Sequence, residues 1–168
     1  LAALAKWRAQ RWASLTSDGG WLSVVGLFWL HPGENRFGSD PANEITLPAG
    51  APALAGTLEL RQDNTVLLHP RPGTGLSLGG SAATERVLAS DRTGAPDVLT
   101  IGAVRFYLIE RGGKLAVRVK DPQSTRRVRF GGIRYFAVDP TYRVEGHFER
   151  YPAPREVAVA TVQGPEQK

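Results

Sequence analysis

Apolar and polar side chains alternate with a period of two along most of the chain after residue 20, and this pattern predicts a mainly β protein. In residues 114–120, for example, Leu115, Val117 and Val119 alternate with basic side chains, as in a half-buried strand. Segments rich in Gly, Pro, Asn and Asp separate these runs, which favours an antiparallel β-sandwich or a flattened barrel. The expected strands are 21–30, 35–39, 44–47, 57–61, 65–69, 76–78, 84–89, 98–101, 104–110, 114–120, 142–149 and 155–162.

Only residues 1–15 have a convincing helical period. Leu4, Trp7 and Leu15 follow a three-to-four spacing, so their side chains form one stripe of an amphipathic N-terminal helix that we expect to pack on the sheet. The glycines after Asp18 end it. The expected organisation is a helix at 1–18, a single β domain at 19–163 and a frayed tail at 164–168.

The longest apolar run, residues 21–30, reads as a buried strand with a kink at Gly26, and it is too short to span a membrane. Together with the inward positions of the other strands it defines the expected core. That core is Trp21, Leu22, Val25, Leu27, Leu58, Leu60, Phe106, Leu108, Val117, Val119, Val144 and Phe148.

Charge is unevenly distributed, although the whole chain of 168 residues carries only +5. Residues 104–155 hold ten Arg and two Lys against five acids, a net +7, and the remainder sums to −2. A basic second half suits an anionic ligand, an acidic protein partner or, less readily, nucleic acid. A solvated, arginine-rich sheet face explains the same residues without any partner.

The chain contains no cysteine and no methionine, and each absence has a consequence. Without cysteine there is no disulfide, thiolate metal site or cysteine nucleophile. Without methionine, Leu1 is not the translation start, so we expect a processed or trimmed chain. The compartment is left open, with the cytoplasm favoured and export after removal of a signal peptide as the alternative.

The sequence contains no recognised motif for a cofactor, a metal or a catalytic centre. The three histidines are far apart, and no phosphate-binding loop, dinucleotide fingerprint or Gly-x-Ser-x-Gly elbow is present. Asp121 and Asp139 could serve as an acid–base pair, but each precedes a proline. A carboxylate that bonds the backbone of its own turn is the favoured interpretation. We expect no cofactor and no metal.

The residues GWLSVVGLFWL at 20–30, PGEN at 32–35 and FGSDPAN at 37–43 form a specific pattern. Later stretches at 106–112, 117–122 and 135–144 add to it. Over nearly its whole length the chain resembles a prokaryotic family known as domain of unknown function 1684. Its members usually continue with a further C-terminal portion, so the resemblance implies a short member or a fragment. It implies no established activity.

A second resemblance is weaker. Residues 37–47, with 98–102 and 106–108, resemble the opening and closing strands of a forkhead-associated domain, a β-sandwich that binds phosphothreonine through its loops. The binding residues differ, because Ser39 stands where that family has an arginine, and Gly73-Thr74-Gly75 replaces an expected Asn-Gly pair. Arginine is the best donor for a phosphate dianion, so this resemblance implies the fold without phosphothreonine recognition.

Binding of a ligand or protein is the favoured function. Its candidate surfaces are the loop end with Ser39, Asn43 and Thr74, or a basic face with Arg118, Arg127, Arg129 and Arg143.

Two alternatives stay open. A small-molecule hydrolase would use a cluster of residues near turns, namely Arg118, Asp121, Tyr135, Tyr142 and Arg143. Alternatively, Arg118 pairs with Asp121 and Tyr142 packs in the core. Nucleic-acid binding would use basic residues interleaved with aromatic ones, at 126–130 and 135–136.

Overall fold

A computed structural model describes residues 2–92 and 94–154. The chain divides into two compact units, Leu1–Gly132 and Ile133–Lys168. The first unit holds all the strands that the structure describes. Among the described residues, no helix combines the length and the apolar character needed to cross a membrane.

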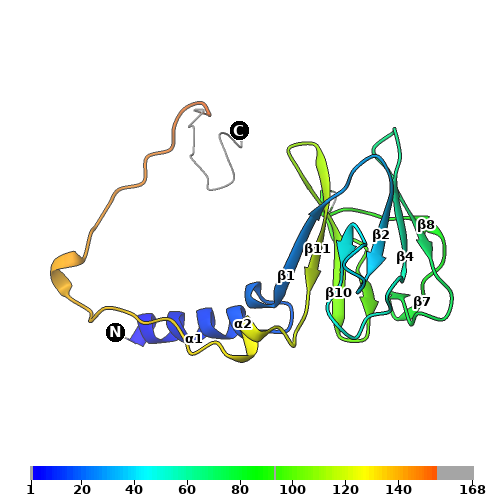
Figure 1. Ribbon diagram of the computed structural model, residues 1–168. Helices are drawn as coiled ribbons and strands as arrows, with labels where there is room; N and C mark the ends of the chain where they lie inside the picture. The colour runs from blue at the N-terminus through cyan, green and yellow to red at the C-terminus, as the bar shows by residue number, and fades with distance from the viewer. Residues whose placement is uncertain (1, 93, 155–168) are drawn as a thin grey trace. The chain divides into compact units, whose positions relative to one another are not determined.

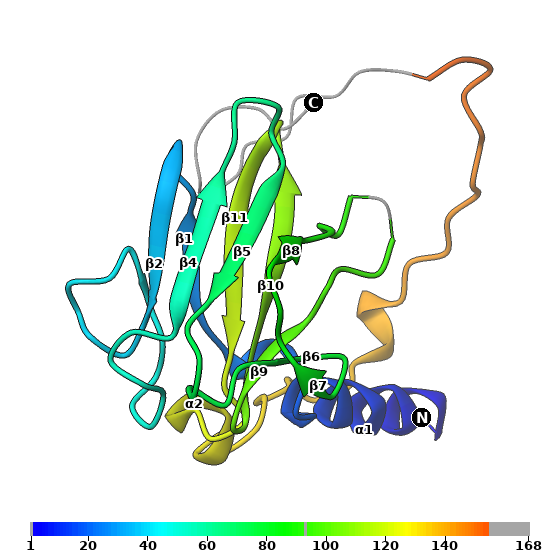
Figure 2. The same cartoon turned by 90° about the vertical axis from the view of Figure 1, so that its right-hand side faces the viewer.

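The first unit contains two sheets, which form an open sandwich rather than a closed barrel (Figures 1 and 2). This confirms the predicted mainly β class. The six-stranded sheet has the order β1-β11-β10-β9-β6-β7, and the five-stranded sheet has the order β3-β2-β4-β5-β8. The strands are β1 Val24–Trp29, β2 Gly33–Gly38, β3 Ile45–Thr46, β4 Gly56–Leu60, β5 Val66–Pro70, β6 Ser77–Leu78, β7 Ser81–Ala82, β8 Arg86–Val87, β9 Leu99–Ile101, β10 Val104–Arg111 and β11 Lys114–Lys120.

Strand pairing is antiparallel except between β2 and β3, which run parallel. The β10–β11 hairpin turns at Gly112 and Gly113, whose φ angles of 56° and 74° lie in the region that side chains with a Cβ rarely adopt. On its other side β11 pairs with β1, and the register shifts between Val24 and Gly26. The predicted kink is therefore a β-bulge.

Phe37 of β2 and Phe106 of β10 join the two sheets in the core. Both rings are fully buried, and their centroids lie 5.3 Å apart. Each large buried aromatic ring removes much apolar surface from water, so this pair anchors the contact between the layers. Five residues of the predicted core are fully buried, namely Leu58, Phe106, Leu108, Val117 and Val119, while Leu22 and Leu60 are half-buried.

The other predicted core residues are wrong. Trp21, which precedes β1, is 67% exposed. Val25 and Leu27 are 38% and 39% exposed, because β1 turns one face to solvent. Val144 and Phe148 are 88% and 86% exposed and belong to the second unit. The run 21–30 is thus a 3₁₀ turn followed by an edge strand with alternating exposure, not a strand buried on both faces.

The N-terminal helix α1 spans Ala2–Thr16, close to the predicted range, and none of its described residues is buried. It lies against the 3₁₀ helix η1 (Trp21–Ser23), and the Trp12 ring stacks on Phe130 with centroids 5.2 Å apart. Gly20 permits the close approach of η1, because a Cβ there would lie 2.4 Å from the Ser14 carbonyl oxygen. These contacts are with the η1 and 130–132 segments and not with a sheet face.

The described part of the second unit, residues 133–154, is called the C-terminal arm. It contains the 3₁₀ helix η2 (Pro140–Tyr142) and no strand, so the predicted strand at 142–149 is wrong. In the first unit a short helix, α2, spans Thr125–Val128. The expected strand 155–162 and tail 164–168 lie outside the described residues, and the single domain at 19–163 stays a prediction.

Candidate binding site

Three neighbouring strands present a mixed aromatic and basic surface on the outer side of the six-stranded sheet. The pairing register places Leu27 of β1, Arg118 of β11 and Tyr107 of β10 in one row across the sheet. The next row holds Trp29, Ala116 and Ile109. Alternation along each strand points these side chains to the outer side of the sheet, where Leu27 and Trp29 are exposed, while Ala116 and Ile109 are buried. We call this surface the basic–aromatic face, made of Trp21, Leu27, Trp29, Tyr107, Arg118 and Lys120.

Each of the two cations of this face lies over an aromatic ring. The Arg118 guanidinium lies 5.6 Å from the centroid of Trp21, and the Lys120 ammonium lies 5.6 Å from the centroid of Tyr107. The Lys120 Nζ also donates to the Gly19 carbonyl at 2.6 Å. Such contacts position charged groups while leaving them able to meet an anion. The face therefore has ordered positive charge beside exposed apolar area.

Outward positions of β1, β10 and β11 carry no carboxylate. At the far end of β10, Arg111 pairs with Asp91 at 2.8 Å, and this guanidinium lowers the pKa of the Asp91 carboxyl. Arg105, which faces outward beside Lys120 in the register, adds a further cation. No outward position of these strands adds an acid, and the carboxylate that acts electrostatically on Arg118 is that of Asp91, which Arg111 pairs. The cations therefore leave the face with an excess of positive charge, which attracts an anion.

The outer edge of β1 has backbone groups that no other described strand pairs. The Leu30 N–H donates to the Leu115 carbonyl at 3.0 Å, which places residues 28 and 26 in the same orientation toward β11. The N–H and C=O groups of Leu27 and Trp29 consequently point away from β11. An edge with this geometry can accept an added strand.

A groove of about 560 Å³ lies beside this edge. Its apolar lining comes from β1 and from the residues that follow β3, and its polar lining comes from Thr46 of β3, from the turn after β11 and from the start of α2. The lining residues are Val25, Phe28, Thr46, Leu47, Pro48, Asp121, Gln123, Ser124, Thr125 and Arg126. An apolar surface bounded by a few polar groups is the usual composition of a binding groove.

The structure places two residues of the predicted hydrolase cluster in the first unit, at different positions. Arg118 lies on the basic–aromatic face, whereas Asp121 lines the groove. The Asp121 carboxylate accepts the Gln123 N–H at 2.8 Å, and its own N–H donates to the Ser23 carbonyl at 2.7 Å. Asp121 therefore stabilises its own Asp-Pro turn, as the favoured interpretation of this dipeptide expects.

Tyr135, Tyr142 and Arg143 belong to the second unit. Tyr142 is 83% exposed, so its expected place in a core is wrong, and Arg143 forms an ion pair with Glu145. Hydrogen bonds from the backbone and the hydroxyl of Thr141 lower the pKa of Asp139, which again marks a turn carboxylate. The hydrolase hypothesis based on these residues stays a prediction.

The side chains of the loop-end candidates form hydrogen bonds to backbone carbonyls of nearby loop residues. Ser39 Oγ donates to the Ala51 carbonyl at 2.8 Å, and Asn43 Nδ2 donates to the Ala53 carbonyl at 2.7 Å. Thr74 Oγ1 donates to a backbone carbonyl, that of Arg71, at 2.8 Å. The polar groups that a ligand would need are thus engaged in local structure.

An exposed ion pair beside this loop end lowers the pKa of a carboxyl. Arg36 Nε donates to a carboxylate oxygen of Glu44 at 3.2 Å, and the Arg36 N–H donates to the same oxygen at 2.8 Å. These hydrogen bonds lower the pKa of Glu44 to about 2. The pair is solvent-exposed and holds β2 to the loop before β3.

Part of the predicted nucleic-acid segment has structural partners. Arg127 Nε donates to the Thr16 carbonyl at 2.7 Å, Nη1 donates to the Pro122 carbonyl at 2.7 Å, and Nη2 pairs with Asp18. Phe130 packs on Trp12. These two side chains attach α2 and the residues after it to the end of α1.

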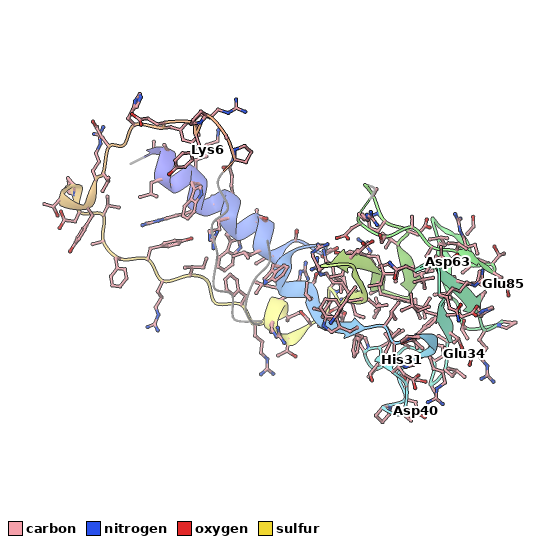
Figure 3. The ribbon with its side chains drawn as sticks, turned by 90° about the horizontal axis from the view of Figure 1, so that it is seen from above. Lys6, His31, Glu34, Asp40, Asp63 and Glu85 are labelled. Atoms are coloured by element: carbon pink, nitrogen blue, oxygen red, sulfur yellow. The ribbon has the colours of Figure 1, made fainter. Side chains whose placement is uncertain are left out.

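One histidine lies in an acidic environment. His69 Nδ1 is 2.9 Å from Glu85, which lies on the surface of the sandwich (Figure 3), and its Nε2 is 3.4 Å from Glu59. The hydrogen bond with Glu85 has the largest effect and raises the pKa of His69, burial opposes it, and the contact with Glu59 raises the pKa further by a smaller effect. Among the described residues no group of three or more His, Asp or Glu side chains is placed to hold a metal ion.

We expect His69→Asn to destabilise the protein more at about pH 5 than at about pH 9. A raised folded pKa stabilises the protein fully below the unfolded value near 6.5, and the stabilisation is lost as the pH rises through the folded value. The side chain is 38% exposed, so screening limits the effect to less than about 1 kcal/mol. Urea unfolding of both proteins at the two pH values measures it, and an equal loss at both would contradict it.

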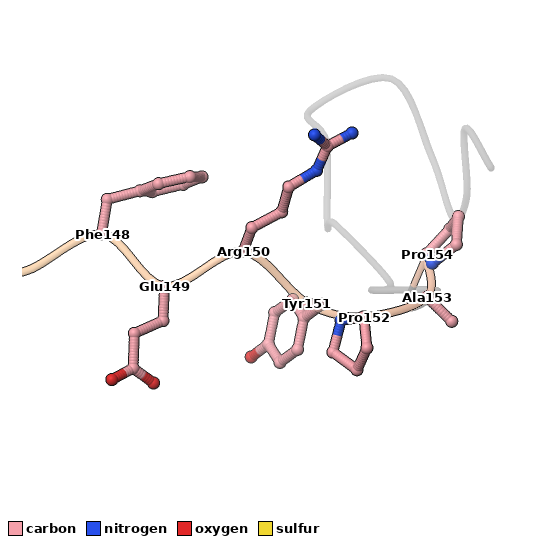
Figure 4. A pocket seen from close by; sticks show the side chains of 7 residues that line it. All are labelled: Phe148, Glu149, Arg150, Tyr151, Pro152, Ala153 and Pro154. Carbon is pink, nitrogen blue, oxygen red and sulfur yellow. The ribbon is translucent and has the colours of Figure 1, made fainter.

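A hollow in the second unit is lined by consecutive residues only, from Phe148 to Pro154. Figure 4 shows Phe148 and Arg150 projecting to one side of the chain, and Glu149 and Tyr151 projecting to the other. Because no second segment closes it, this hollow is not a built site. It does record the alternation expected of extended backbone.

Comparison with known proteins finds a similarity over the last part of the chain. Residues 128–168 match the model of the family described as Protein of unknown function (DUF1684). This confirms the resemblance to that family, and the matched range includes the stretch 135–144 but not the earlier stretches. No curated protein matches.

A solved structure also matches, the refined NMR structure of the FHA1 domain of yeast Rad53. The identity is 13%, the match covers 75% of each chain, and the TM-score is 0.32. This match fits the weaker resemblance to a forkhead-associated domain. The chain is a β-sandwich module whose residues 128–168 are similar to a family of unknown function.

The basic–aromatic face could not be located from the sequence around β1 alone. The sequence singled out Arg118, but it placed Trp21 and Leu27 in the core. The signal that could have corrected this was the pattern of 114–120, since a strand with Arg118 and Lys120 on one face must leave that face in solvent.

Proposed function

We propose that this β-sandwich is a protein-binding module whose basic–aromatic face takes an extended acidic segment of a partner protein. The observation that carries the proposal is the ordered pair Arg118–Trp21 and Lys120–Tyr107, on strands whose outward positions lack any carboxylate. Glutamate or aspartate side chains would meet the cations, and apolar side chains between them would cover Trp29 and Leu27, which are 49% and 39% exposed.

The β1 edge favours a polypeptide over a nucleic acid. Leu27 and Trp29 direct N–H and C=O groups outward, and only a peptide backbone offers the alternating acceptors and donors that match them. Arg127 and Phe130, which nucleic-acid binding would need, are already in contact with the α1 end of the molecule. Exposed aromatic rings beside cations also suit stacked bases, so single-stranded DNA remains a competing ligand in the test.

We expect a synthetic peptide that alternates Glu and Val to quench the fluorescence of the exposed Trp21 and Trp29, with an affinity that falls as salt is added. The Arg118→Glu variant should bind about tenfold more weakly, because it replaces an attraction by a repulsion. Titration by fluorescence and by calorimetry measures both effects.

Three controls make the titration decisive. Arg71→Glu makes the same charge change at an exposed position in another part of the sandwich and should leave the affinity unchanged. A peptide that alternates Lys and Val should not bind. If oligothymidylate bound and the Glu–Val peptide did not, the face would be a nucleic-acid surface and the protein-binding proposal would be overturned.

A further inference from the structure

A hollow of about 550 Å³ is lined by residues of both sheets, from β8 of the five-stranded sheet and from β6, β9 and β10 of the six-stranded sheet. This volume lies in the range of sites that hold small organic ligands. Every lining residue belongs to the first unit. The lining residues are Leu78, Gly79, Gly80, Arg86, Pro96, Asp97, Val98, Thr100 and Arg105.

Two guanidinium groups from different sheets line this hollow, and most of their hydrogen-bonding capacity is unused. Arg105 is exposed, and no carboxylate of the described residues lies within ion-pair distance of it. Arg86 Nη2 lies 3.9 Å from Asp97 Oδ2, which is too far for a hydrogen bond. A guanidinium carries several N–H donors in a rigid planar fork, so both arginines can bind the oxygens of an anion.

Asp97 is the one carboxylate of this lining, and it has a structural partner. Its Oδ2 accepts the Ala89 N–H at 2.9 Å, and its own N–H donates to the Ala89 carbonyl at 3.1 Å. The Asp97 side chain is 23% exposed, whereas that of Arg86 is 52% exposed. Asp97 therefore fastens its backbone to that of Ala89, and two arginines against one aspartate leave the lining with a net charge of +1.

A hydroxyl and an open turn border the two cations. Thr100 pairs with Arg105 in the strand register, so their side chains lie next to each other, and among the described residues the Thr100 hydroxyl has no hydrogen-bond partner. The Gly79–Gly80 turn between β6 and β7 has no side chain that could cover this border. Val98, which is 37% exposed, adds apolar surface. The hollow thus combines cations for an anionic group with apolar area for an organic one.

We propose that this hollow binds the phosphate group of a small phosphate monoester. Arg86 and Arg105 contact the phosphate oxygens, the Thr100 hydroxyl donates a further hydrogen bond, and the organic part of the ligand covers Val98. A phosphate monoester carries close to two negative charges at pH 7, so it gains from two cations, whereas a carboxylate with one charge gains less. The inference goes beyond the proposed function, because β11 separates Arg105 of β10 from the edge of β1.

Phenyl phosphate is the probe, titrated against the isotope-labelled full chain by NMR and against the unlabelled chain by calorimetry. We expect the largest amide shifts at Gly79, Gly80 and Thr100, and an affinity about tenfold higher than for benzoate, which carries a single charge on the same ring. Arg86→Gln and Arg105→Gln should each weaken binding of phenyl phosphate about tenfold.

Two further variants separate a built site from general attraction of anions. Lys114→Gln makes the same change of charge at an exposed position at the other end of β11, six residues from the Lys120 that pairs with Arg105, and should leave the affinity unchanged. Arg105→Lys keeps the charge but loses the planar fork, so its affinity should be intermediate.

Equal affinities for phenyl phosphate and benzoate, or an equal loss in Lys114→Gln, would overturn the inference. Shifts away from the hollow, or none at millimolar phenyl phosphate, would do the same. Tighter binding of a phosphoserine peptide would also overturn it, because the ligand would then be a protein. If an arginine variant failed to fold, the positions of the shifts in the unchanged chain would still decide the question.

Discussion

Asn35→Leu should lower the free energy of unfolding by about 3 to 4 kcal/mol, the largest loss that we expect from one exchange of similar size. Asn35 is fully buried, and its Oδ1 accepts the His31 N–H at 3.0 Å. Its Nδ2 donates to the carbonyls of His31, Gly33 and Leu58 at 2.9, 3.0 and 3.2 Å. Leucine would leave these backbone groups without a partner, and the cost of each is about 1 to 3 kcal/mol.

Urea denaturation measures this loss, and a thermal scan should show a fall in Tm of about 10 °C. Asn35→Asp keeps the acceptor oxygen but loses the donors, so its loss should be intermediate. Glu34→Gln changes the exposed neighbour and should have almost no effect. A loss below about 1 kcal/mol for Asn35→Leu would mean that water replaces the amide.

Gly38→Ala should lower the free energy of unfolding by about 2 to 3 kcal/mol. A Cβ at this position would lie 2.2 Å from the Ala53 carbonyl oxygen, and backbone cannot move aside as a flexible side chain can. The same approach lets Ser39 and Asn43 bond the 51–53 segment. The variant therefore tests whether this loop end is held together as a structural unit.

Gly19→Ala is the matched control, because a Cβ there has no atom within 4 Å. It should unfold at the same urea concentration as the unchanged chain, or at a slightly higher one, since alanine reduces the freedom of the unfolded state. Equal stability of Gly38→Ala and Gly19→Ala would show that the loop relaxes without cost, and the close approach at Gly38 would then have no structural role.

Regular alternation made the central hairpin predictable. Residues 114–120 have one apolar and one basic face, and Gly112-Gly113 supplies a turn that only glycine adopts easily, so strand bounds and parity followed from local chemistry. The C-terminal arm was wrongly predicted to contain a strand for a related reason. Residues 142–149 have strand periodicity, but a strand forms only where a neighbour pairs with it, and no local signal reveals that neighbour.

The candidate site depended on contacts that local patterns do not encode. Trp21, Leu27 and Trp29 stand in a run that is apolar at both parities, so the exposed side could not be told from the buried one. Only the pairing of β1 with β11, more than eighty residues later in the chain, puts Leu27 beside Arg118. Arg118 was predicted as a binding residue from charge, and its aromatic neighbours depend on that pairing.

Recognition of an acidic segment at the β1 edge can be observed residue by residue in an NMR titration of the isotope-labelled full chain with the peptide that alternates Glu and Val. Strand addition at the basic–aromatic face predicts the largest shifts at the amides of Leu27 and Trp29, together with the Trp21 indole N–H and the Arg118 side chain. Shifts confined to the Ser39 and Thr74 loops, or no shifts at a saturating peptide concentration, would contradict it.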